Sequence, residues 1–252
     1  MADEKAYGSK YWLNKMIDDD GELLSAELEK IPGVKVIKDT GVPLPEPPVE
    51  KVPGNASRGN HPEKSLEKYL VDWKYISEEH ELYRWWVDPP WKKPTWDYIC
   101  QATVGGKEGL ILVEAKAHRN ETSRSKKQEP QRKGKTTDDS YEIMKSNHTR
   151  IESNITSQLS ELGGEYSGYY QISNRIAYAN KVRKTLELPV LLVFLGFINP
   201  DNHFPDRFKK KLEWECKIRD ELRSLKLEHL TKTPIQELTD SPGLWILSYP
   251  DI

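Results

Sequence analysis

The stretch TWDYICQATVGGKEGLILVEAKAH, residues 95–118, decides the fold. Two largely apolar runs flank Gly105-Gly106, and such a pair is typical of a two-residue hairpin turn, which needs positive φ at its central positions. We therefore predict two antiparallel strands, Thr95–Val104 and Gly109–Ala117. The run GLILV is almost continuously apolar, which is typical of a strand that is covered on both faces.

The hairpin turn predicts which polar side chains meet. Paired positions are symmetric about Gly105-Gly106, so Asp97 is expected directly opposite Glu114, with Cβ atoms ~5 Å apart. Lys116 lies two residues after Glu114 and returns to the same face. A divalent cation between the carboxylates would relieve their repulsion, and such hard oxygen ligands suit Mg²⁺ or Mn²⁺. An ion triad in which Lys116 neutralises both carboxylates is the structural alternative.

The rest of the chain predicts helices around this hairpin. Apolar residues at helical spacing begin at Leu66, and a strand is expected at Leu82–Val87. Further elements follow the hairpin: helices over 151–162 (closed by Gly163 and Gly164), 168–187 and 206–227, and strands over 189–198 and 244–249. We predict a mixed α/β domain with a central mixed sheet flanked by helices, its core in the order α-β-β-β-α-β.

Two regions are expected along the chain. Residues 1–60 form an N-terminal extension, and residues 61–252 form the main domain. The extension holds a short amphipathic helix or two and then, over 31–60, a proline-rich linker. Prolines at 43, 45, 47, 48 and 53 oppose regular helix there and favour an extended path.

Composition excludes several classes of protein. The net charge of -2 excludes a generally basic nucleic-acid coat, although local basic patches remain possible. No apolar run approaches the ~20 residues of a membrane helix, and the first residues show no signal peptide. Cys100 and Cys216 fit no metal-ligand spacing. We expect a cytoplasmic protein without a membrane partner; its oligomeric state stays open.

The residues of the hairpin also resemble a known signature. Asp97, followed by Glu114-Ala115-Lys116 after an apolar strand, resembles the PD-(D/E)XK motif of restriction-endonuclease-like nucleases, with Trp96 in place of the motif's proline. The resemblance covers about residues 61–200 and implies a restriction-endonuclease-like core. It implies a Mg²⁺-dependent (or Mn²⁺-dependent) nuclease that hydrolyses phosphodiester bonds of DNA. Asp97, Glu114 and the Ala115 carbonyl would hold the metal, and Lys116 would assist the attacking water.

The same resemblance suggests further site residues on two helices. Family members often carry a metal-binding glutamate on the first core helix, where Glu63 and Glu67 are the candidates. Glu63 is preferred because it falls nearer the Leu66 face, although a first-turn glutamate is also favoured by the helix dipole alone. Exonuclease-like branches place a glutamine on the helix after the lysine strand, and Gln171 fits that position. Arg175 stands where those branches often have tyrosine, and its guanidinium could contact phosphate.

A basic loop follows the second strand of the hairpin. Residues 118–135 hold seven Lys and Arg residues against two Glu residues. Beside a metal site, such a loop is a candidate contact for the nucleic-acid backbone, and a merely solvated loop is the alternative. The candidate contacts are Arg119, Arg124, Lys126, Lys127, Arg132 and Lys133.

Two other functions fit the same residues. The first is a catalytically silent nucleic-acid-binding or scaffold module on the same fold. The second is a metal-dependent hydrolase that uses the same carboxylates on a small substrate. The sequence leaves open DNA or RNA, single or double strands, and endonuclease or exonuclease action.

Overall fold

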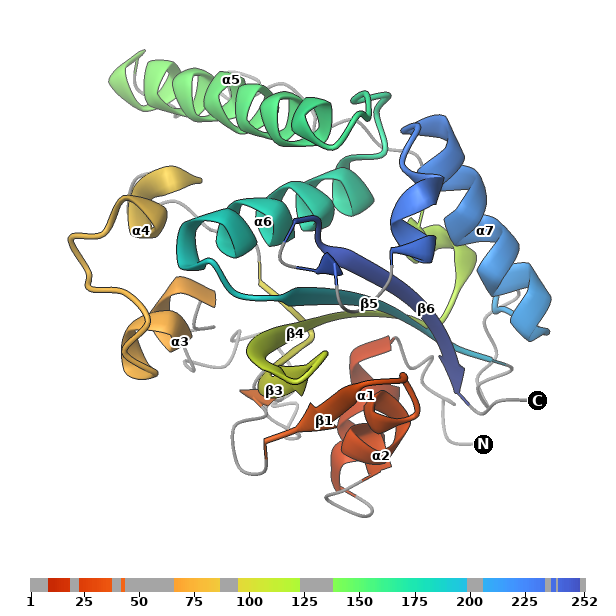
Figure 1. The fold of residues 1–252 in the computed structure, drawn as a ribbon. Helices are drawn as coiled ribbons and strands as arrows, with labels where there is room; N and C mark the ends of the chain where they lie inside the picture. Colours follow the sequence, from red (N-terminus) through yellow and green to blue (C-terminus); the bar gives the residue numbers. More distant parts are fainter. Residues whose placement is uncertain are drawn as a thin grey trace, which may run out of the picture.

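A mixed β-sheet forms the centre of the computed structural model (Figure 1). Strand β3 (Tyr98–Val104) pairs antiparallel with β4 (Lys107–Lys116), and β5 (Val190–Phe197) and β6 (Gly243–Tyr249) continue the sheet in parallel. The structure describes residues 9–18, 23–37, 42–43, 66–86, 95–122, 138–198, 206–233, 237–238 and 240–249. A mixed α/β fold with a central sheet is therefore confirmed.

The hairpin has the predicted turn and register. Gly105 and Gly106 have φ of 60° and 81°, as a two-residue turn with both central residues at positive φ requires. Val104 pairs with Lys107 next to the turn, and Tyr98 pairs with Val113 at the far end of β3. Continuing this register by one residue places Asp97 opposite Glu114.

The first part of the chain joins the sheet. Helices α1 (Ser9–Asp18) and α2 (Leu23–Glu29) lie on one face of it, and β1 (Val34–Val36) pairs antiparallel with β3 (Figure 1). The two-residue strand β2 (Val42–Pro43) pairs with the other end of β3. The segment 31–60, expected as a proline-rich linker, therefore contains two short strands that join the sheet. Alternate residues Val34 and Val36 are buried on the sheet, which supplies the burial that so short a strand needs.

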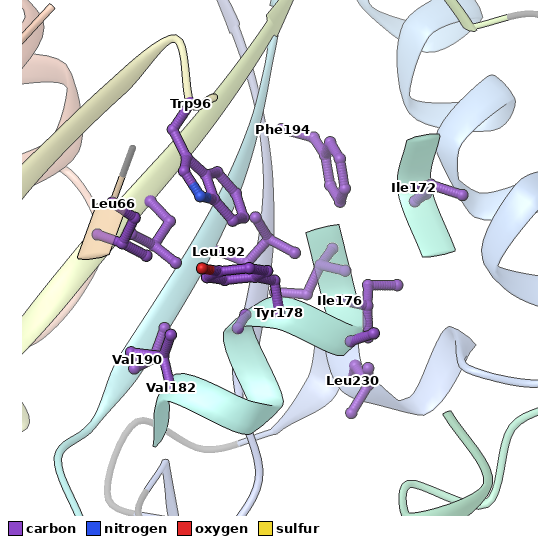
Figure 2. Packing of buried hydrophobic residues seen from close by; sticks show 14 of the residues in the cluster. Leu66, Trp96, Ile172, Ile176, Tyr178, Val182, Val190, Leu192, Phe194 and Leu230 are labelled. Carbon is purple, nitrogen blue, oxygen red and sulfur yellow. The ribbon is translucent and has the colours of Figure 1, made fainter. Parts of the chain in front are cut away.

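The opposite face carries most of the remaining helices. Figure 1 shows α6 (Tyr170–Leu186) lying between the sheet and α5 (Asp138–Glu161), with α7 (Lys211–Ser224) beside it. Helix α3 (Leu66–Asp72) packs into the same core, where Tyr178 of α6 meets Trp96 with ring centroids 6.4 Å apart (Figure 2). The single-turn helices η1 (Arg119–Thr122) and η2 (Glu228–Lys232) complete the described elements outside the sheet. None of the described helices is long and apolar enough to cross a bilayer.

One predicted strand is a helix. Residues Glu81–Trp85 form α4, so the predicted strand over 82–87 is wrong. The His80 side chain accepts a hydrogen bond from the Leu82 backbone N–H at 3.1 Å and so caps the first turn. Leu82 and Trp86 lie four residues apart and are both buried, because that spacing brings them to one helical face.

Helix α7 docks on the sheet at a glycine. A Cβ atom on Gly196 of β5 would come within 2.5 Å of the Trp214 indole, so only glycine lets this ring lie flat on the strand. The indole Nε1 donates to the Leu247 carbonyl oxygen at 2.8 Å. These contacts fix the position of α7 on the sheet, and so determine which α7 side chains face β4.

Candidate active site

The end of the hairpin gathers the residues predicted for the site. The Asp97 carboxylate accepts a hydrogen bond at Oδ2 from the Ala115 backbone N–H at 2.7 Å. The Lys116 ammonium donates to Oε1 of Glu114 on the same face of β4. The predicted convergence of Asp97, Glu114 and Lys116 on one face is thus present, because the two-residue turn fixes which residues face each other.

A second cation reaches Glu114 from helix α6. The Arg175 Nε donates to Oε2 of Glu114 at 2.6 Å, and its guanidinium lies over the Trp96 ring at 4.8 Å. Glu114 is 3% exposed, and Lys116 and Arg175 are each 9% exposed. We call Asp97, Glu114, Lys116 and Arg175 the charged cluster. Arg175, proposed from sequence as a phosphate contact, lies inside this cluster.

The two carboxylates of the cluster titrate in opposite directions. Burial raises the pKa of Asp97 from 3.8 to about 7, and the charge of Glu114 adds to this against the opposing Lys116. Burial also acts to raise the pKa of Glu114, but Arg175 and Lys116 outweigh it and lower that pKa to about 2. The positive charges of Arg175 and Lys116 therefore compensate Glu114 well, whereas they compensate the negative charge of Asp97 poorly.

A pocket opens beside the charged cluster. It has a volume of about 330 Å³ counting the part open to solvent, and it is lined by Glu114, Lys116, Thr122, Tyr169, Gln171, Ile172, Phe194, Ile218 and Glu221. Gln171 comes from the exposed start of α6 and shares this pocket with Glu114 and Lys116. The three residues predicted together from sequence thus border one space.

Glu221 is a pocket residue that no sequence pattern singles out. This residue lies on α7 and is 4% exposed, and its Oε1 is 3.0 Å from the Lys217 ammonium. Burial raises the pKa of Glu221, against the opposing charges of Lys217 and then Lys116. Helix α7 holds several acidic residues at similar spacing, and only the docking of Trp214 decides which of them faces the pocket.

Two glutamates, Glu63 and Glu67, are the candidates for a metal ligand on the first helix. Glu63, the preferred candidate, lies outside the described residues. Glu67, the other candidate, is 0% exposed and accepts a hydrogen bond from the Tyr178 hydroxyl in the core beside Trp96.

The basic loop is described only at its start. Arg119 is exposed and lies 3.4 Å from Glu213 of α7, whereas Arg124, Lys126, Lys127, Arg132 and Lys133 lie outside the described residues. A second basic segment, residues 207–211, lies against this start. The Arg119 backbone N–H donates to the Asp206 carbonyl at 2.9 Å, and His118 forms a β-bridge with Arg207. The start of the basic loop and a basic segment distant in sequence thus meet at the end of β4.

The donor atoms of the cluster are of the kind that Mg²⁺ prefers. Two carboxylates and the Ala115 carbonyl are hard oxygen ligands. The raised pKa of Asp97 marks negative charge that a cation would compensate. Within the described part of the chain, no group of three or more His, Cys, Asp and Glu side chains gathers closely enough to hold a metal. A divalent cation here would have two carboxylates and one carbonyl as its protein ligands, and Lys116 or Arg175 would have to release an oxygen of Glu114 to it.

The chain was also compared with known proteins. Neither models of protein families nor curated proteins nor solved structures match it.

Proposed function

We propose that this protein is a Mg²⁺-dependent nuclease that hydrolyses phosphodiester bonds of DNA on a restriction-endonuclease-like core. The observation that carries the proposal is the pairing at the end of the hairpin. Asp97, Glu114 and Lys116 lie on one face of adjacent strands. Glu114 and Lys116 also border a pocket that Gln171 shares. Two carboxylates and a lysine in this arrangement suit metal-assisted attack of water on a phosphate ester.

Three residues of the charged cluster and two residues beside it have roles in the proposed reaction. Asp97, Glu114 and the Ala115 carbonyl would hold Mg²⁺ or Mn²⁺. A bound divalent cation would stabilise the negative charge that develops on the phosphate and polarise its oxygens. The Lys116 ammonium orients the attacking water from the pocket, and the Gln171 amide positions the scissile strand by hydrogen bonds.

The two basic segments favour a polyanionic substrate over a small one. Arg119 and residues 207–211 lie side by side at the end of β4 that carries Lys116. Lys209 and Lys210 are exposed there, so their ammonium groups can contact phosphates of a strand that enters the site. Five further candidate contacts, Arg124, Lys126, Lys127, Arg132 and Lys133, follow Arg119 in the sequence.

A catalytically silent nucleic-acid-binding or scaffold module is the second candidate. One observation favours it: both oxygens of Glu114 already have cationic partners, Lys116 and Arg175. A buried carboxylate between two cations is a complete structural unit without a metal. The basic segments would then bind nucleic acid and no bond would be cleaved.

Cleavage assays separate the two candidates. Linear and circular double-stranded DNA, single-stranded DNA and RNA are incubated with the protein in Mg²⁺, in Mn²⁺ and in chelator. The nuclease predicts cleavage that needs the metal and is lost in Asp97→Asn and Lys116→Ala. Asp220 is exposed, so Asp220→Asn is the control for removal of a carboxylate, and this variant should retain cleavage. Binding without cleavage in every condition would identify the silent module.

A further inference from the structure

Glu221 of α7 has no role in the reaction as proposed, although it lines the same pocket as Glu114 and Lys116. It is 4% exposed, and its Oε1 pairs with Lys217. Across the described ranges of the chain, no hydrogen bond reaches its Oε2. A nearly buried carboxylate with one oxygen unengaged thus faces the space beside Lys116.

The proposed hydrolysis needs a group that accepts a proton. A water molecule that attacks phosphorus must lose a proton as the new bond forms. The ammonium of Lys116 has three donors and no acceptor, so it can orient the water but cannot take its proton. An acceptor must therefore reach the same pocket from another residue.

The other carboxylates near the pocket are engaged. Glu114 accepts from Lys116 at one oxygen and from Arg175 at the other. Asp97 accepts from the Ala115 N–H, and both carboxylates would also ligate the metal in the proposed reaction. The Gln171 amide can accept a hydrogen bond but does not take up a proton near neutral pH. Among the described residues that line the pocket, Glu221 is the carboxylate outside the proposed metal site.

The pocket suits a small nucleophile. Its enclosed part accepts a water-sized group and is too small for a nucleobase. The side chains of Ile172, Phe194 and Ile218 form an apolar wall around it. A carboxylate on such a wall is a stronger proton acceptor than one in bulk water, because desolvation disfavours its charged form.

We propose that Glu221 is the general base of the hydrolysis, an inference that rests on the proposed function. The water oxygen forms a bond to phosphorus while the bond from phosphorus to the leaving ester oxygen breaks, and its electron pair stays on that oxygen. The proton of the water passes to the Glu221 carboxylate, and the leaving oxygen takes a proton from solvent. Lys116 holds the water for this transfer, and Lys217 anchors the other oxygen of Glu221.

Steady-state cleavage kinetics at saturating Mg²⁺ test this role in the full-length protein. Glu221→Gln keeps the size of the side chain and removes the proton acceptor, so kcat should fall by about 10²–10⁴-fold. The KM for DNA and the Mg²⁺ affinity measured by calorimetry should stay near the wild-type values, because Glu221 is not placed among the metal ligands. Glu221→Asp retains a carboxylate and should recover part of the lost kcat.

Two control variants separate catalysis from a structural ion pair. Lys217→Gln breaks the same pair, and Asp220→Asn removes one negative charge from an exposed position of the same helix. Asp220→Asn should keep kcat near the wild-type value. Lys217→Gln should lower kcat far less than Glu221→Gln does, because the carboxylate that accepts the proton is still present. If Lys217→Gln lowers kcat as much as Glu221→Gln does, the pair is structural and the inference is overturned. Should Glu221→Gln fail to fold, Glu221→Asp takes its place. The inference then requires kcat to fall more in Glu221→Asp than in Lys217→Gln, and an equal or smaller fall overturns it.

The outcomes for wild type and variant are distinguishable. A wild type that cleaves DNA with Mg²⁺, beside a Glu221→Gln variant that cleaves equally fast, overturns only the role of Glu221. A wild type that does not cleave with any metal overturns the proposed function, and the role of Glu221 with it. Metal-dependent cleavage that collapses in Glu221→Gln, with Mg²⁺ binding intact, supports both.

Discussion

Replacing Asp97 by Asn tests whether the charged cluster carries uncompensated negative charge without metal. The pKa of Asp97 is raised from 3.8 to about 7 by burial and by Glu114. A carboxyl group with a raised pKa stabilises the folded state below its ordinary pKa, and this contribution is lost as the pH rises through about 7. Linkage over about pH 5 to pH 8.5 gives a loss of roughly 2–3 kcal/mol in the free energy of unfolding.

The substitution should remove this pH dependence. Asn keeps the oxygen that accepts from the Ala115 N–H but has no charge to bury. Glu114, with a pKa of about 2, stays ionised in the folded state over the whole range. In chelator, the wild type should therefore lose roughly 2–3 kcal/mol more than Asp97→Asn between the two pH values, since the other titrating groups are common to both.

Urea denaturation of both proteins at each pH, with chelator and with Mg²⁺, measures the difference. Excess Mg²⁺ should restore stability to the wild type at the higher pH by mass action, by about 2.7 kcal/mol at a hundredfold excess over Kd. It should affect Asp97→Asn much less, because an amide is a poorer ligand. If wild type and Asp97→Asn lose the same free energy of unfolding between the two pH values in chelator, Asp97 does not carry an uncompensated charge and the reasoning is refuted.

Further substitutions test the remaining roles. Lys116→Ala should abolish cleavage and keep the Mg²⁺-induced rise in melting temperature, whereas an ion triad without metal predicts lower stability and no response to Mg²⁺. Arg175→Met leaves a buried carboxylate short of one partner and should cost about 3–5 kcal/mol in chelator by urea denaturation, with part of the loss recovered in Mg²⁺. Neutralising Arg119, Lys209 and Lys210 together should flatten the log-log salt dependence of DNA binding by about 0.9 per lost phosphate contact, and an unchanged slope would remove these side chains from the interface.

The register of the site could be predicted because it depends on local chemistry. Gly105-Gly106 fixes the turn, and the turn fixes which residue of β3 faces which residue of β4. The apolar run of β5 and the periodicity of α6 were equally readable, since long and regular patterns specify their elements well. Asp97, Glu114 and Lys116 could therefore be placed together from sequence alone.

What the sequence could not predict depends on tertiary docking or on weak local signals. The short apolar run at Leu82–Val87 fits a strand or a helix, and the His80 cap decides for the helix. The engagement of Arg175 with Glu114 requires α6 to pack at one particular rotation over β4. Glu221 faces the pocket because Gly196 lets the Trp214 ring lie against β5, a contact with no signature in the spacing of either residue.

Some residues of the charged cluster are close to one another in sequence, and others are far apart. Asp97 and Lys116 belong to one hairpin, which can form within microseconds because its ends are close in sequence. The Arg175–Glu114 contact spans 61 residues, so its closure must wait for α5 and α6 and for the parallel pairing of β4 with β5. We therefore expect the two carboxylates to meet during folding before Arg175 reaches them. If the proposed metal site is correct, Mg²⁺ would shield the two carboxylates in that interval, and the rate of folding should then rise with Mg²⁺ concentration.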